Sequence, residues 1–130
     1  MLKKFNPDGI MKPFNNAYHH GVVIPADAEV LHISGQVGVR PDETLPDTIE
    51  EEAEQAWANV MAVVAGAGMS VENIVKINAY LTDDTHYGAF AAARAKVLGD
   101  ARPASTGIIV KRLVLPEWHI EIDCVAAKVP

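Results

Sequence analysis

The segment 118–127 alternates between apolar and polar side chains, and this alternation constrains the fold more than any other feature of the chain. Side chains two apart on a strand point to the same face of a sheet. A strand with this pattern therefore has one face in a hydrophobic core and one face outside it. The apolar face carries Ile120, Ile122 and Cys124, and the polar face carries His119, Glu121 and Asp123.

Two helices are predicted, and each has clear end signals. The first follows Thr48, which has capping-box spacing to Glu51, and it ends at the glycines of 66–68. The second is capped by a residue of 83–85 and ends at Gly99. One face of the first helix carries Ile49, Ala53, Ala56, Trp57, Val60 and Val64, and one face of the second carries Tyr87, Phe90, Ala91, Arg94, Val97 and Leu98.

The remaining apolar segments predict a sheet that two helices cannot cover on both faces. Strands are expected at 22–24, 30–33, 75–82, 107–113 and 118–127, with a further short strand near 3–6. The sequence 34–36 breaks the second of these, and 37–47 reads as a loop. We therefore expect a single α+β domain over 1–130 with a mixed sheet and two helices on one face. The uncovered face must meet water or another subunit.

Composition limits the classes of function. With 49% hydrophobic residues, the 130-residue chain can build a core without a disulfide or a structural metal, and its single Cys124 is typical of a cytoplasmic protein. No apolar run approaches the ~20 residues that span a bilayer, so no membrane association is expected. The formal net charge of −6 disfavours nucleic acid as a partner.

The polar face of the last strand holds the candidate chemistry. Glu121 and Asp123 lie two apart, with Cα atoms ~6.6 Å from each other, so they could act as general acid and base. An ordinary solvated strand face is the alternative. His119 joins them in a pattern that could also ligate a metal, but alternation alone explains the grouping, and we expect no metal site. Cys124 lies on the buried face and is not a candidate nucleophile.

Six blocks of the chain share an order and a composition with one known family: Tyr18–Val22, Ile33–Gln36, Gln55–Asn59 with Gly66–Gly68, Asn73–Lys76, Pro103–Ser105 and Ile120–Ala126. Over about 18–127 these blocks resemble the Rid (YjgF/UK114) family. The resemblance implies a chorismate-mutase-like fold in which three subunits pack their sheets into a central barrel. It also implies hydrolysis of enamines or imines such as 2-aminoacrylate, without metal or organic cofactor, in a cleft between subunits.

Carried over residue by residue, the resemblance assigns a role to Glu121 as the acid that positions the attacking water. Pocket-lining positions fall on Tyr18, Ser34 and Gly35, and Ser105 and Thr106 are expected to shape the same pocket.

Ser105 is a departure from the family pattern, because enamine deaminases have an arginine there that holds the substrate carboxylate. Two hypotheses follow: an enamine or imine hydrolase whose substrate is not the usual 2-aminoacrylate, or a homotrimer that binds a small-molecule ligand with little catalysis. The family is also associated with RNA cleavage, which the net charge disfavours.

Overall fold

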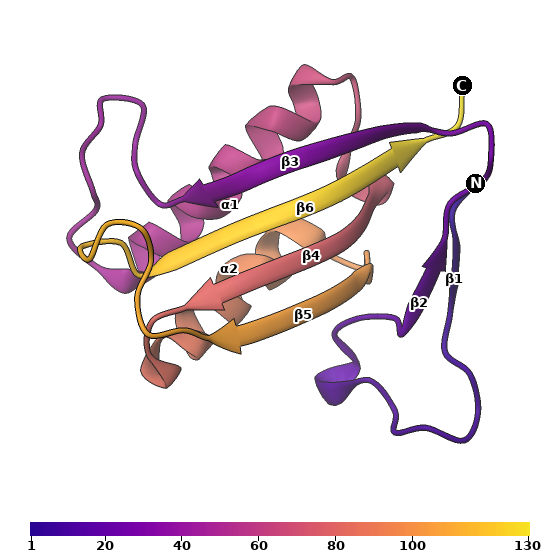
Figure 1. Cartoon of the computed structure of the whole chain (residues 1–130), viewed down its shortest axis with the longest axis horizontal. Coiled ribbons are helices and arrows are strands. Elements are labelled where there is room, and N and C mark those ends of the chain that lie inside the picture. Colours follow the sequence, from indigo (N-terminus) through magenta and orange to yellow (C-terminus); the bar gives the residue numbers. More distant parts are fainter.

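The computed structural model describes residues 1–130, and in it two α-helices lie behind a four-stranded sheet (Figure 1). The expected fold class, α+β with a mixed sheet and both helices on one face, is confirmed. The elements in chain order are β1 Lys3–Phe5, β2 Gly21–Val23, β3 Glu29–Val37, α1 Ile49–Gly66, β4 Ile74–Leu81, α2 Tyr87–Leu98, β5 Ala104–Ile109 and β6 Ile120–Lys128.

The sheet has the strand order β3-β6-β4-β5, so the last strand of the chain lies in its interior. β6 is antiparallel to both β3 and β4, whereas β4 and β5 are parallel and are connected through α2. β1 and β2 form a separate antiparallel pair, which Figure 1 shows to one side of the main sheet. The expected extra strand near 3–6 is therefore present as β1.

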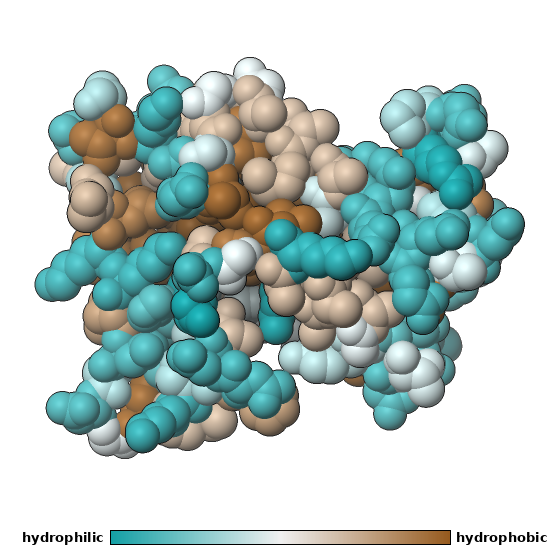
Figure 2. Space-filling model, turned by 180° about the vertical axis from the view of Figure 1, so that it is seen from behind, coloured by the Kyte–Doolittle hydropathy of each residue, from teal (hydrophilic) through white to brown (hydrophobic).

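The core lies between the sheet and the two helices. Every apolar residue of the predicted α1 stripe is buried apart from half-buried Ile49, and Trp57 packs against Phe90 of α2 with ring centroids 6.0 Å apart. On β6 the apolar alternation faces this layer, with Ile120, Ile122 and Cys124 all buried. The opposite face of the sheet has no helix over it, as expected. Seen from the helix side, the periphery of the surface is largely hydrophilic, and the most hydrophobic residues lie mainly in one band across it (Figure 2).

The ends of both helices follow the predicted signals. The Thr48 hydroxyl accepts a hydrogen bond of 3.2 Å from the Glu51 backbone N–H, which satisfies one of the free donors at the start of α1. Asp83 caps the short 3₁₀ turn Asp84–His86 that leads into α2. Gly99 ends α2 with φ of 56°, a conformation that glycine adopts without steric cost. No helix has the length and apolar character needed to cross a membrane.

Two strands, β3 and β5, differ from the sequence prediction by more than two residues at one end or both. β3 does not end at Ile33 but continues to Val37, because Ser34 and Gly35 form a bulge and pairing with β6 resumes at Gln36. A bulge bends the strand without ending it. β5 begins at Ala104 and ends at Ile109, earlier than expected, because it pairs with β4 over that range.

The predicted placement of His119 beside Glu121 and Asp123 is wrong. His119 Nδ1 donates a hydrogen bond of 2.7 Å to Glu52 of α1, and the backbone N–H groups of His119 and Ile120 also donate to this carboxylate, at 2.8 and 3.2 Å. Glu52 is only 2% exposed. A buried carboxylate needs donors, and this requirement turns the His119 ring away from the polar face.

Candidate functional site

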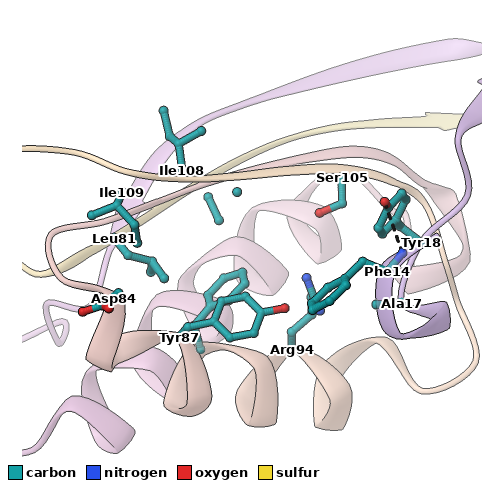
Figure 3. A pocket seen from close by; sticks show the side chains of 13 residues that line it. Phe14, Ala17, Tyr18, Leu81, Asp84, Tyr87, Arg94, Ser105, Ile108 and Ile109 are labelled. Atoms are coloured by element: carbon teal, nitrogen blue, oxygen red, sulfur yellow. Dashed lines mark hydrogen bonds between the residues drawn. The ribbon is translucent and has the colours of Figure 1, made fainter. Parts of the chain in front are cut away.

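A cavity of about 440 Å³ lies between α2, the β4–β5 pair and the N-terminal segment (Figure 3). β4 and β5 form one wall, because Ser105, Gly107 and Ile109 pair with β4 residues whose side chains face the helix layer. Tyr87, Phe90 and Arg94 of α2 form the opposite wall, and Phe14, Ala17 and Tyr18 close one end. We call this space the Ser105 pocket.

The N-terminal segment is tied to the start of β5, which places Tyr18 beside this pocket. The backbone N–H of His19 donates to the Pro103 carbonyl at 3.2 Å, and His19 Nδ1 donates to the Arg102 carbonyl at 2.6 Å. The Tyr18 hydroxyl accepts a bond of 3.3 Å from the Phe14 N–H, drawn as the dashed line in Figure 3. Its proton remains available to another acceptor.

The open face of the sheet carries a second group of polar residues. Asp123 accepts a hydrogen bond of 2.8 Å from Asn78 Nδ2 and another of 2.8 Å from the Tyr80 hydroxyl. The bond to Asp123 raises the pKa of Tyr80, since it stabilises the protonated phenol. Both oxygens of Asp123 are thus engaged, and this carboxylate is held in place.

Glu121, by contrast, makes no hydrogen bond or ion pair within the chain. Its half-buried carboxylate lies directly over Gly35, so close that a Cβ at that position would overlap it. The bulge at Ser34 and Gly35 lies opposite this part of β6. Together with Tyr80 and Arg112, the two acids line an open depression of about 540 Å³, which we call the Glu121 depression.

The residues predicted for one site fall into two groups within the chain. Tyr18 and Ser105 line the Ser105 pocket on the helix side. Gly35 and Glu121 lie together on the open face. Thr106 points to the same open face, where its hydroxyl accepts a hydrogen bond of 2.7 Å from Lys76 Nζ. The Ser34 carbonyl accepts a bond of 3.1 Å from Gln36 Nε2 within the bulge.

The sequence prediction did not include Arg94, the only cationic side chain that lines the Ser105 pocket. A signal existed, because this arginine interrupts an otherwise apolar face of α2 that also carries Tyr87 and Phe90. Asn78 and Tyr80, which hold Asp123, were also missed. Their alternation along β4 could have placed them on the polar face.

Neither a reactive cysteine nor a metal site contributes to the Ser105 pocket or to the Glu121 depression. Burial raises the pKa of the Cys124 thiol to about 12, and the side chain is 2% exposed. Such a thiol stays protonated and is a poor nucleophile. No three His, Cys, Asp or Glu side chains are arranged to hold a metal ion.

Comparison with known proteins gives consistent matches over nearly the whole chain. The family model described as endoribonuclease L-PSP matches residues 11–128. The mitochondrial protein mmf2 of Schizosaccharomyces pombe is 32% identical over 118 residues, which are 89% of this chain and 88% of that protein. A RutC family protein of Aquifex aeolicus is 35% identical over 75% of this chain and 80% of its own length.

Solved structures agree with these matches. The Rid family protein YyfB of Yersinia pestis, described as of unknown function, superposes with a TM-score of 0.86 at 26% identity, covering 98% of both chains. Yeast Mmf1 superposes with a TM-score of 0.72 at 26% identity, covering 98% of this chain and 99% of that one. By family model, sequence and fold, the chain belongs to the Rid family, also called the YjgF/YER057c/UK114 family.

Proposed function

We propose that this protein is a homotrimeric hydrolase of enamines or imines in which Glu121 acts as the general base and then as the general acid. Membership of the Rid family supports a function on small molecules. The observation that carries the proposal is the difference between the two acids of β6. Asp123 is held by Asn78 and Tyr80, whereas Glu121 has no partner and faces an open depression. A carboxylate without a partner is free to accept a proton from water.

The chemistry needs one such group. Water adds to the carbon of a protonated C=N bond, and Glu121 takes the proton that the water loses. The resulting carbinolamine carries a hydroxyl and a neutral amine on the same carbon. Glu121 returns its proton to the amine, and as the C–N bond breaks the hydroxyl proton passes to the departing ammonia, so that a carbonyl product and ammonium leave. One carboxylate can serve both steps because it ends in the state in which it began.

The arrangement of the two spaces supports a site between subunits. Ser105 and Glu121 lie on opposite faces of one sheet, so one chain cannot bring them to the same substrate. In a trimer, the Ser105 pocket of one subunit can meet the Glu121 depression of the next. The homotrimer is thus part of the proposal, as is a cytoplasmic location.

A non-catalytic trimer that binds a small ligand is the second candidate, and Ser105 favours it. A serine cannot neutralise a carboxylate, whereas an arginine holds it with two charge-assisted hydrogen bonds. RNA is not the substrate that we propose, although the family model is described as an endoribonuclease. The net charge of −6 opposes binding to a phosphate backbone.

The test is an enamine-decay assay with 2-aminoacrylate that a dehydratase generates in place. We expect wild type to be slow, Ser105→Arg to form keto acid roughly 10- to 100-fold faster, and Ser105→Arg with Glu121→Ala to lose the gain. The expected gain follows from orientation of the imine carbon by a held carboxylate. If Ser105→Arg gains nothing although it folds, the binding module is favoured. Equal rates with and without Glu121 would refute its role.

A further inference from the structure

Arg94 brings an uncompensated positive charge into the Ser105 pocket. Its guanidinium makes no hydrogen bond or ion pair within the chain, although the side chain is only half-exposed. It lies over the Phe90 ring, with Cζ 5.4 Å from the ring centroid, and this contact holds it against the pocket wall. In Figure 3 Arg94 extends from α2 into the pocket, and the Ser105 hydroxyl enters from β5.

The one acidic side chain that lines the pocket, Asp84, does not neutralise Arg94. Asp84 precedes α2 and lies ten residues before Arg94, which corresponds to roughly 15 Å along a helix axis. A partly desolvated guanidinium gains most from an anion that accepts two of its N–H groups. The Arg94 end of the pocket is therefore suited to an anionic ligand.

The rest of the lining is suited to an apolar body. Leu81, Tyr87, Phe90 and Ile109 surround the space, and Gly107 has no side chain to fill it. The hydroxyls of Tyr18, Tyr87 and Ser105 are the neutral polar groups of the lining. The volume of about 440 Å³ is within the range of small-molecule sites.

We propose that the Ser105 pocket binds small monocarboxylates with an apolar body, and that Arg94 holds the carboxylate. This inference deepens the proposed function and rests on it only for turnover, because binding can be measured without catalysis. The carboxylate of the ligand would be bound by a residue of α2 instead of by a residue of β5. A substrate anchored there has to reach across the pocket, so we expect a bulkier anion than 2-aminoacrylate.

The two arginines near the candidate spaces are less suitable anchors. Arg102 donates to the Asn16 and Asp100 carbonyls at 2.7 and 3.0 Å. Arg112 donates to the Leu113 and Val114 carbonyls at 3.1 and 2.9 Å. Each would have to break existing hydrogen bonds to hold a ligand, whereas Arg94 would not.

The experiment is titration calorimetry of the full-length protein with 4-methyl-2-oxopentanoate and, as the uncharged probe, its amide. We expect wild type to bind the anion at least about tenfold more tightly than the amide. Arg94→Gln should remove this preference while leaving binding of the amide nearly unchanged. Lys96→Gln is the matched control, because it removes the same charge from the same helix at an exposed side chain paired with Glu54 outside the pocket.

Each result decides for or against the inference. Equal affinity of wild type for both probes, an anion preference that survives in Arg94→Gln, or a loss as large in Lys96→Gln would overturn it. Circular dichroism melts confirm that the variants are folded. Glu121 lies on the other face of its own subunit, so Glu121→Gln should lose turnover and keep anion binding. Failure of the hydrolase proposal would therefore change the turnover result alone, and failure of this inference would change the anion-binding result alone.

Discussion

Gly35 is the residue where backbone geometry and candidate chemistry are most closely linked. The Glu121 carboxylate occupies the space that a side chain at position 35 would need. The obstructing atoms are the end of a flexible side chain, so a larger residue at position 35 would displace the carboxylate without unfolding the strand. The absence of a side chain at Gly35 therefore sets the position of Glu121.

Gly35→Ala should remove hydrolysis while leaving the fold intact. We expect the free energy of unfolding to change by less than about 1 kcal/mol, and keto-acid formation by Ser105→Arg protein to fall when Gly35→Ala is added. Denaturant melts and the enamine assay measure the two effects. Gly88→Ala is the control, because a Cβ there meets no atom within 4 Å. Full activity in Gly35→Ala would contradict the role of this close contact.

Cys124 should make stability fall in alkaline solution. Its pKa is raised to about 12 in the folded protein by burial, from an ordinary value of 9.0, so the folded state keeps a proton that the unfolded state loses. The stability contribution is fully present below pH 9 and is lost as the pH rises toward 12, by at most about 1.4 kcal/mol per pH unit. Tyr80, whose pKa is also raised, acts in the same direction.

Urea denaturation from pH 6 to 11 measures this dependence. Wild type should lose stability more steeply than Cys124→Ala above pH 9, since the alanine variant has no thiol to ionise. Below pH 8 the two curves should run parallel. Parallel curves over the whole range would show that the thiol does not contribute.

At the scale of elements, Glu52 links α1 to the beginning of β6. Its buried carboxylate accepts hydrogen bonds from two backbone N–H groups and from the His119 ring. Gly38 makes room for this arrangement, because a Cβ there would overlap Glu52 atoms. The strand that carries Glu121 is thus anchored to the first helix just before it enters the sheet.

Glu52→Ala should destabilise the protein by about 3–5 kcal/mol, because it leaves buried donors without an acceptor. Glu54→Ala on the same helix should cost less than about 1 kcal/mol, since its ion pair with Lys96 is exposed. Denaturant unfolding of both variants measures the difference. If both variants lose a similarly small amount of unfolding free energy, the N–H donors of His119 and Ile120 must form hydrogen bonds to water in Glu52→Ala.

At the scale of the whole molecule, the open face of the sheet requires a partner or water. Light scattering at micromolar concentration should give about three times the chain mass of 14.0 kDa. Mixing tests whether the site is shared: in the Ser105→Arg background, co-expressed Tyr18→Ala and Glu121→Gln chains should recover activity that neither variant has alone. A monomer in solution, or no recovery in mixed trimers, would contradict the site between subunits.

The sequence alone determined the elements of local origin. Thr48 and Gly99 predicted helix ends because capping depends on residues a few positions apart. The alternation around Ile122 identified one buried and one open face for the same reason, since strand periodicity is local. The placement of Glu121 on the open face followed directly from that alternation.

Tertiary structure decided the contacts that no local pattern contains. Glu52 and His119 are 67 residues apart, and only the packing of α1 against the start of β6 turned the His119 ring away from Glu121. Arg94 reached the Ser105 pocket because α2 crosses over the β4–β5 pair. Side chains distant in sequence meet wherever burial and hydrogen bonding of the whole chain are satisfied together, and that condition cannot be evaluated one segment at a time.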